Sequence, residues 1–159
     1  MEWDAGAAVL AGIVGTLVMT AVLYAGKWML PEQMPMDILR MQGTMMTRNV
    51  GAAYVIGAMT HTVMGIIFAL IHTALYHALG IEEGLLGWGI LFGAVHWVIA
   101  RMGFSMMGAM HPLMKSGEMT TPGPFAKNYP MMTVVGFLML HVIYGLVVGS
   151  VYEGIVFSA

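Results

Sequence analysis

Four long apolar segments dominate the pattern of hydrophobic and polar positions along this chain. They cover about residues 5–30, 51–78, 85–107 and 131–155, and the stretches between them hold most of the polar residues. An apolar run of 18 or more residues is typical of a helix that crosses a bilayer. The pattern therefore predicts an all-α fold, an integral membrane four-helix bundle in which residues 1–159 form a single transmembrane domain.

The connections between these segments differ in length and in turn chemistry. A short turn at 80–84 carries Glu82 and Glu83, whereas the first and third connections are long. Within the first connection, residues 37–46 predict a short amphipathic helix at the membrane surface. Proline interrupts helices, so a continuous helix is excluded across 108–130. The prolines in that window are Pro112, Pro122, Pro124 and Pro130.

Charge predicts the orientation of the bundle. All six basic residues lie on or toward the two long connections: Lys27, Arg40, Arg48, Arg101, Lys115 and Lys127. Five of the eight acidic residues lie near the two termini or in the 80–84 turn: Glu2, Asp4, Glu82, Glu83 and Glu153. Because cytoplasmic loops carry an excess of Lys and Arg, we expect connections 31–50 and 108–130 to be cytoplasmic and both termini to lie on the outer side. The expected location is the bacterial inner membrane, with several passes.

Composition excludes several classes of protein. Hydrophobic residues make up 59% of the chain and charged residues 9%, whereas charged residues are roughly a quarter of an average soluble domain. The absence of cysteine excludes disulfides, thiolate metal ligands and thiol nucleophiles. The few basic residues form no stripe, so no nucleic-acid partner is expected. The expected partners are the lipid bilayer and other transmembrane subunits, or a second copy of the chain.

Histidines inside the apolar segments are the candidate site residues. Segment 51–78 has no Asp, Glu, Lys or Arg, yet it contains three histidines. By the rise of an α-helix, His61, His96 and His141 all lie near the membrane midplane. Three converging imidazoles would suit zinc or copper, and two from facing helices would suit haem b. These three histidines are therefore candidate metal or cofactor ligands.

Two other interpretations of the histidines stay open. A buried neutral imidazole can donate a hydrogen bond to a carbonyl or hydroxyl group on a neighbouring helix, which is a purely structural role. His61 and His72 are eleven residues apart and share a helix face, so they could also mark a polar track toward the outer side. No His-Glu-x-x-His spacing is present to favour metal binding.

Small residues and methionines complete the pattern. Glycines spaced four apart let helices approach closely, and the candidate packing positions are Gly15, Gly65, Gly89, Gly93, Gly145 and Gly149. Methionine is frequent, with 19 residues, and most of these lie in or beside the two long connections. Thioethers suit Cu(I), but they also make an adaptable surface for docking another protein or lipid, which is the simpler interpretation.

Short motifs distributed over most of the chain resemble an uncharacterised family of small bacterial four-helix membrane proteins, a domain of unknown function. The motifs are Ala11-Gly12 with Thr16, His61-x-x-x-Gly65, Phe92-Gly93 with Trp97, His111-Pro112 and His141-x-x-Tyr144-Gly145. The resemblance implies a four-span bundle. It implies no established activity and no catalytic residues.

These observations favour a non-catalytic role, because no nucleophile elbow, phosphate-binding loop or deep carboxylate is present. We expect an accessory or structural subunit that packs against a larger bacterial inner-membrane complex of respiratory, photosynthetic or oxygenase-like kind. The alternative is a metal- or haem-binding membrane protein that uses the midplane histidines. A third possibility is a small transporter or channel.

Overall fold

The computed structural model describes residues 2–157 and confirms the predicted all-helical fold. Its four long helices are α1 (Ala5–Met29), α3 (Val50–Ala78), α4 (Leu85–Met110) and α6 (Met131–Val156). All four are long and apolar enough to cross a membrane. The boundaries agree with the predicted spans within a few residues, and the largest difference is that α4 continues to Met110.

Local signals set the ends of these helices. The Asp4 carboxylate accepts a hydrogen bond from the Ala7 backbone N–H at 2.9 Å, and the Asn49 side chain caps α3 in the same way. Such caps satisfy N–H groups that lack a partner in the first turn of a helix. Gly84 starts α4 with φ of +65°, a left-handed conformation that glycine adopts at little cost.

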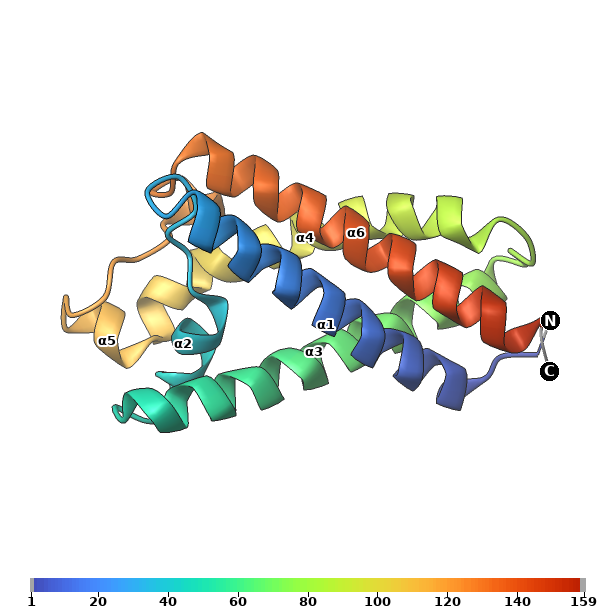
Figure 1. Cartoon of the computed structure of the whole chain (residues 1–159), viewed down its shortest axis with the longest axis horizontal. Coiled ribbons are helices and arrows are strands. Elements are labelled where there is room, and N and C mark those ends of the chain that lie inside the picture. Colours follow the sequence, from blue (N-terminus) through green and yellow to red (C-terminus); the bar gives the residue numbers. More distant parts are fainter. Residues whose placement is uncertain (1, 158–159) are drawn as a thin grey trace.

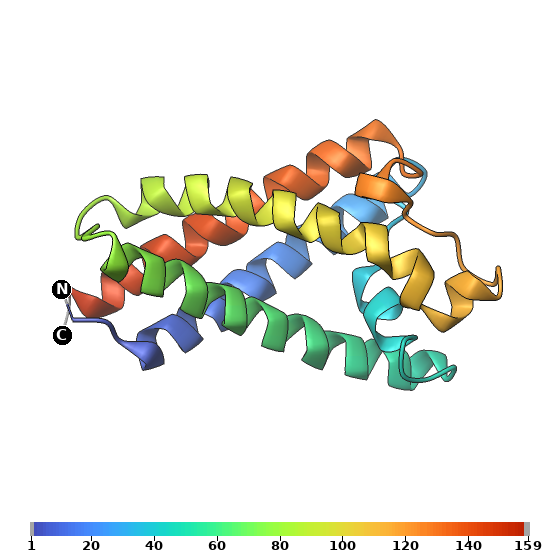
Figure 2. The ribbon, with the colours of Figure 1, turned by 180° about the vertical axis from the view of Figure 1, so that it is seen from behind.

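The four long helices pack in the order α3, α1, α6, α4. α4 lies along α6, α6 along α1 and α1 along α3, whereas α3 touches α4 at few positions. Figures 1 and 2 show that the helices converge at the end that holds both termini and the turn between α3 and α4, and spread apart at the opposite end. The bundle is therefore closed at one end and widens toward the long connections.

Two short helices fill the wide end: α2 (Ile38–Gly43) and α5 (Pro112–Lys115). The prediction of an amphipathic helix in the first connection is confirmed, but its expected position at the surface is wrong. Ile38, Met41 and Gly43 are buried, and α2 packs against α3. A Cβ atom at Gly43 would overlap the Ala53 carbonyl. Glycine therefore lets the backbone of α2 lie directly on α3.

Two polar clusters hold the long connections in place. The Asp37 carboxylate accepts hydrogen bonds from Lys27 Nζ at 2.5 Å, Tyr24 Oη at 2.6 Å and Tyr54 Oη at 2.7 Å. Burial on its own raises the pKa of Asp37, but these hydrogen bonds outweigh that effect and lower the pKa to about 2. The first connection is thereby tied to both α1 and α3.

The second cluster joins α2 to α5. The fully buried His111 donates from Nε2 to the Met41 carbonyl at 2.9 Å, and its Nδ1 accepts from the Leu113 N–H at 3.2 Å.

A short 3₁₀ helix, η1 (Pro124–Ala126), follows in the same connection. Arg101 donates two hydrogen bonds to the Phe125 carbonyl, at 2.6 and 3.0 Å, so this residue holds the second connection against α4.

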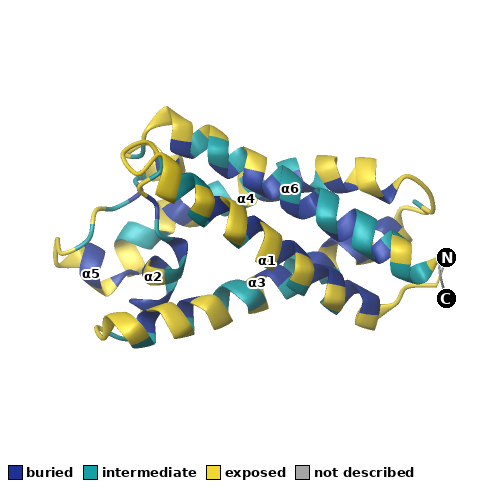
Figure 3. Ribbon diagram, viewed as in Figure 1, coloured by how far each residue is buried: buried dark blue, intermediate teal, exposed yellow. Residues whose placement is uncertain are grey.

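Figure 3 shows exposed positions along the outer faces of the long helices. Many of the exposed residues are large and apolar. α3 and α4 bury a smaller share of their surface inside the bundle than α1 and α6 do. A water-soluble protein rarely exposes so much contiguous apolar surface. The structure is therefore that of a multi-pass membrane protein whose helices face lipid.

Candidate functional site

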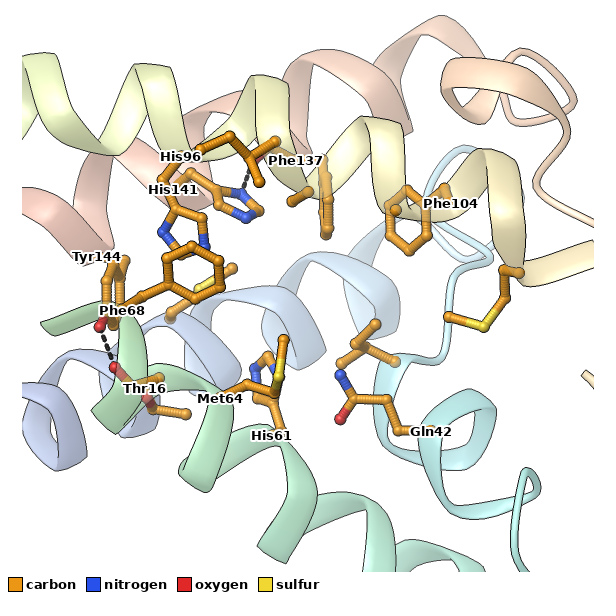
Figure 4. Close-up of a pocket in the computed structure, with 17 residues that line it drawn as sticks. Thr16, Gln42, His61, Met64, Phe68, His96, Phe104, Phe137, His141 and Tyr144 are labelled. Atoms are coloured by element: carbon orange, nitrogen blue, oxygen red, sulfur yellow. Dashed lines mark hydrogen bonds between the residues drawn. The ribbon is translucent and has the colours of Figure 1, made fainter. Parts of the chain in front are cut away.

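A cavity of about 310 Å³ lies between α3 and α4, inside the part of the bundle that widens. α1 and α6 form its back wall, and α2 closes it toward the long connections with Ile38 and Gln42. Figure 4 shows side chains from all five helices around this space. The cavity has the size of a small-molecule site.

The rim of the cavity faces outward between α3 and α4. Met64 on α3 and Ile99 on α4 both line the cavity, and they are 44% and 51% exposed on the outer surface. Because these helices have few contacts with each other, their gap opens sideways from the bundle. In a bilayer this opening faces the lipid chains.

The walls of the cavity are mainly apolar and aromatic. Phe68, Phe104 and Phe137 line it, together with the thioethers of Met19 and Met64. The ring of Phe68 stacks on the imidazole of His96, with 3.6 Å between ring centroids and 20° between planes. This pair presents a flat surface of the kind that favours planar ring systems.

The three candidate ligand histidines all line this cavity. Each lies about 15–17 Å along the axis from the start of its helix. His96 and His141 are in contact, with ring centroids 4.8 Å apart in an edge-to-face arrangement. Figure 4 shows His61 on a separate wall, away from that pair. The structure thus brings two of the three predicted residues together and leaves the third across the cavity.

His72, which the sequence suggested could mark a polar track together with His61, lies beside His96. Its ring centroid is 5.6 Å from that of His96. His72, His96 and His141 therefore form the continuous imidazole cluster of the bundle core. Within residues 2–157, no three His, Asp or Glu side chains are arranged to hold one metal ion. The hypothesis of copper, zinc or haem b at His61, His96 and His141 gains no support from this geometry.

His141 has a structural role, but its hydrogen bond stays within its own helix, whereas the sequence had suggested a bond to a neighbouring helix. His141 Nδ1 donates to the Phe137 carbonyl of its own helix at 2.7 Å. The hydroxyl of Tyr144 donates to the Gly65 carbonyl on α3, which links α6 to α3 beside the cavity. These bonds fix the orientation of the His141 and Tyr144 side chains on α6.

Three buried polar atoms of the lining residues have no hydrogen-bond partner among the residues that the structure describes. They are Gln42 Oε1, His61 Nε2 and His96 Nδ1. Buried polar groups without a partner are rare in folded proteins, and each calls for a physical reason. Their position on the walls of one cavity is the most specific feature of the site.

The six predicted packing glycines all lie at helix contacts. An added Cβ at Gly89 would overlap the Gly145 carbonyl, and one at Gly145 would overlap the Gly89 carbonyl. The other four also have close neighbours: Gly15 faces Tyr144, Gly65 faces Thr16, Gly93 faces His141 and Gly149 faces Leu85. Glycines thus bring α4 and α6 into backbone contact. This contact fixes the position of His96 relative to His141 along the two helix axes.

The methionines of the connections divide between interior and surface. Met36, Met41 and Met114 are buried and fill the wide end of the bundle, whereas Met46 and Met131 are more than 70% exposed. Some of the methionines therefore fill irregular apolar space between the short helices and the connections.

Gln42 is a polar lining residue that sequence reasoning missed. It lies in a connection that we expected at the surface, and it reaches the cavity because α2 folds inward. The available signal was the glycine that follows it, Gly43, whose lack of a side chain permits this inward packing.

These features define a class: a small all-helical protein with four membrane-spanning helices around a cavity that opens sideways. The chain belongs to the family described as "Family of unknown function (DUF6789)", whose family model matches residues 3–156. The resemblance to an uncharacterised family is thereby confirmed. No curated protein and no solved structure matches the chain.

Proposed function

We propose that this protein binds a lipid-soluble molecule with a flat, hydrogen-bonding head group, of the quinone and quinol class, in the cavity between α3 and α4. One observation carries the proposal: an apolar cavity that opens toward lipid has on its walls three polar atoms without a hydrogen-bond partner among the described residues. An apolar pocket with a few convergent polar groups is the usual form of a small-molecule site.

The chemistry of the walls matches that class of ligand. An imidazole nitrogen can donate to a carbonyl oxygen or accept from a hydroxyl group, and the Gln42 amide oxygen can accept from a hydroxyl group. The stacked Phe68 and His96 rings give a flat wall for a planar head group. An apolar tail would leave through the opening beside Met64 and Ile99 into the lipid. The role is binding, without catalysis.

A pair of glycine variants on α4 tests the proposal. Gly103 lines the cavity and Gly87 does not, and an added Cβ would meet nothing within 4 Å at either position. Gly103→Leu should fill the mouth of the cavity and abolish binding of decylubiquinone, used as the probe. Gly87→Leu should leave binding unchanged. Isothermal titration calorimetry on the detergent-purified proteins measures the affinity of each variant for decylubiquinone.

A third variant tests the polar contact. His96→Phe keeps a ring stacked on Phe68 but removes both nitrogens, so it should weaken binding of decylubiquinone about tenfold, the effect of losing one hydrogen bond. Equal affinity of the wild type, Gly103→Leu and His96→Phe would contradict the proposal.

The accessory-subunit hypothesis remains as a second proposal. The observation that favours it is the small buried share of α3 and α4, which leaves long apolar faces for another transmembrane helix. Purification from native membranes in mild detergent should then yield larger subunits that co-migrate with this chain. A lone, monodisperse protein would count against this second proposal and would leave ligand binding in place.

The proposed location is the bacterial inner membrane, with connections 31–50 and 108–130 in the cytoplasm and both termini outside. Support comes from the positions of the basic residues, which cluster toward the wide end of the bundle. The chain has no cysteine, so Glu83→Cys and Lys115→Cys each introduce one label site. In spheroplasts, an impermeant maleimide should label Glu83→Cys at once and Lys115→Cys only after lysis. The reverse pattern would invert the orientation.

A further inference from the structure

A second polar cluster lies deeper in the bundle than the cavity, toward the end that holds the termini. The rings of His72, His96 and Tyr144 form a triangle, with centroids 5.6, 5.6 and 5.9 Å apart. Tyr76 follows His72 by one helical turn on α3, on the same face. Its ring stacks on Phe92 of α4. His72 is 3% exposed and Tyr76 is fully buried.

Three atoms of this cluster have no hydrogen-bond partner within residues 2–157: His72 Nδ1, His96 Nδ1 and Tyr76 Oη. They come from two helices that have few contacts with each other. Direct hydrogen bonds between the three side chains are absent from the described structure, so none of them satisfies another. A buried water molecule typically makes two to four hydrogen bonds to such groups.

The chemistry of the three groups selects the ligand. A neutral imidazole nitrogen donates or accepts according to its tautomer, and a tyrosine hydroxyl does both. Water has the same dual capacity, so it can pair with each of these groups. The surrounding side chains include the apolar rings of Phe92 and Phe68. The Glu153 carboxylate lies near enough to Tyr76 to act on it electrostatically, but no three His, Asp or Glu side chains among the described residues are arranged to hold a metal ion.

We propose that His72, Tyr76 and His96 bind water inside the bundle and form a proton-exchange site behind the cavity. His96 belongs to both places, because its ring also lines the cavity. Protons on its ring can therefore exchange with internal water, which gives any occupant of the cavity an indirect route to a proton donor and acceptor. This proton-exchange site goes beyond the proposed quinone binding and does not depend on it.

Nuclear magnetic resonance of the protein labelled with ¹⁵N-histidine tests this site, in detergent and without any quinone. Magnetisation should pass from water protons to Nδ1 of His72 and His96. His141 is an internal control, because its Nδ1–H donates to the Phe137 carbonyl at 2.7 Å. His141 Nδ1 should show no such transfer.

A tyrosine pair adds a matched control. Tyr76→Phe removes one anchor of the water and should slow the exchange at His72 about tenfold, the effect of one lost hydrogen bond. Tyr152 is also fully buried, but its hydroxyl accepts from the Asp4 N–H, so Tyr152→Phe should leave His72 unchanged. If transfer to His72 in the wild type is no stronger than transfer to His141, the proposal is overturned. This test does not require that the variants fold. An unchanged rate in Tyr76→Phe removes Tyr76 from the site.

Discussion

Gly145→Ala is expected to cost at least about 3 kcal/mol of unfolding free energy, the upper part of the range for overpacking. The added methyl group would overlap the carbonyl of Gly89 and approach the N–H of Gly93. Both obstacles are backbone atoms, so no side chain can rotate away, and α4 would have to separate from α6. A small folded protein is stable by only about 5–15 kcal/mol. Circular dichroism during denaturant titration in mild detergent measures the loss.

Gly87→Ala is the matched control for this prediction. Gly87 lies in the same helix as Gly89, and an added Cβ would meet nothing within 4 Å. Alanine is about 1 kcal/mol better than glycine inside a helix, so Gly87→Ala should unfold at the same denaturant concentration as wild type or higher. Similar losses in both variants would mean that α4 and α6 are not in backbone contact at Gly145.

Asp37→Ala is expected to destabilise the protein by about 2–4 kcal/mol, because it removes a helix cap and leaves a partly buried cation unpaired. Lys27 would lose its ion pair at 2.5 Å, and two tyrosine hydroxyls would lose their acceptor. Asp37→Asn keeps an oxygen acceptor and should lose about half as much. Glu118→Ala breaks the exposed ion pair with Arg48 and should have no measurable effect.

The Asp37 cluster also predicts the acid response of the protein. The pKa of Asp37 falls from 3.8 to about 2 in the folded chain, so the folded state holds this proton less tightly than the unfolded chain does. The stabilisation is complete above about pH 4 and is lost as the pH falls toward 2. Wild type should lose stability across that window, and Asp37→Asn should lack this component. If the two proteins lose the same amount of stability between pH 4 and pH 2, the assignment to Asp37 is contradicted.

Much of the fold could be predicted from the sequence because its strongest signals are local. Four apolar segments of membrane-crossing length, a proline at each end of the 112–130 stretch and a glycine turn at 80–84 place every long helix within a few residues. Four spans joined in this way put both termini at one end, as Figure 1 shows. The orientation and the particular membrane remain predictions.

The site was harder to predict because it depends on helix rotation. In a helix that is apolar on all sides, the period of hydrophobic residues does not show which face points inward. Depth alone grouped His61 with His96 and His141. The tilt of α3 matters as well: His61 and His72 share a face of this helix, but His72 lies three turns nearer the end where the helices converge, so it reaches His96 while His61 stays across the cavity. The inward fold of α2, which adds Gln42 to the cavity, depends on contacts between distant segments.

The sparse contact between α3 and α4 has a mechanical consequence. α3 is held by α1 and by α2, and its closest approach to α1 is the crossing at Gly12 and Gly65. α4 belongs to the other half, where glycines join it to α6. The seam between α3 and α4 is therefore the part of the bundle that the fewest helix contacts hold closed. In a bilayer, a guest molecule would enter and leave the cavity through this seam.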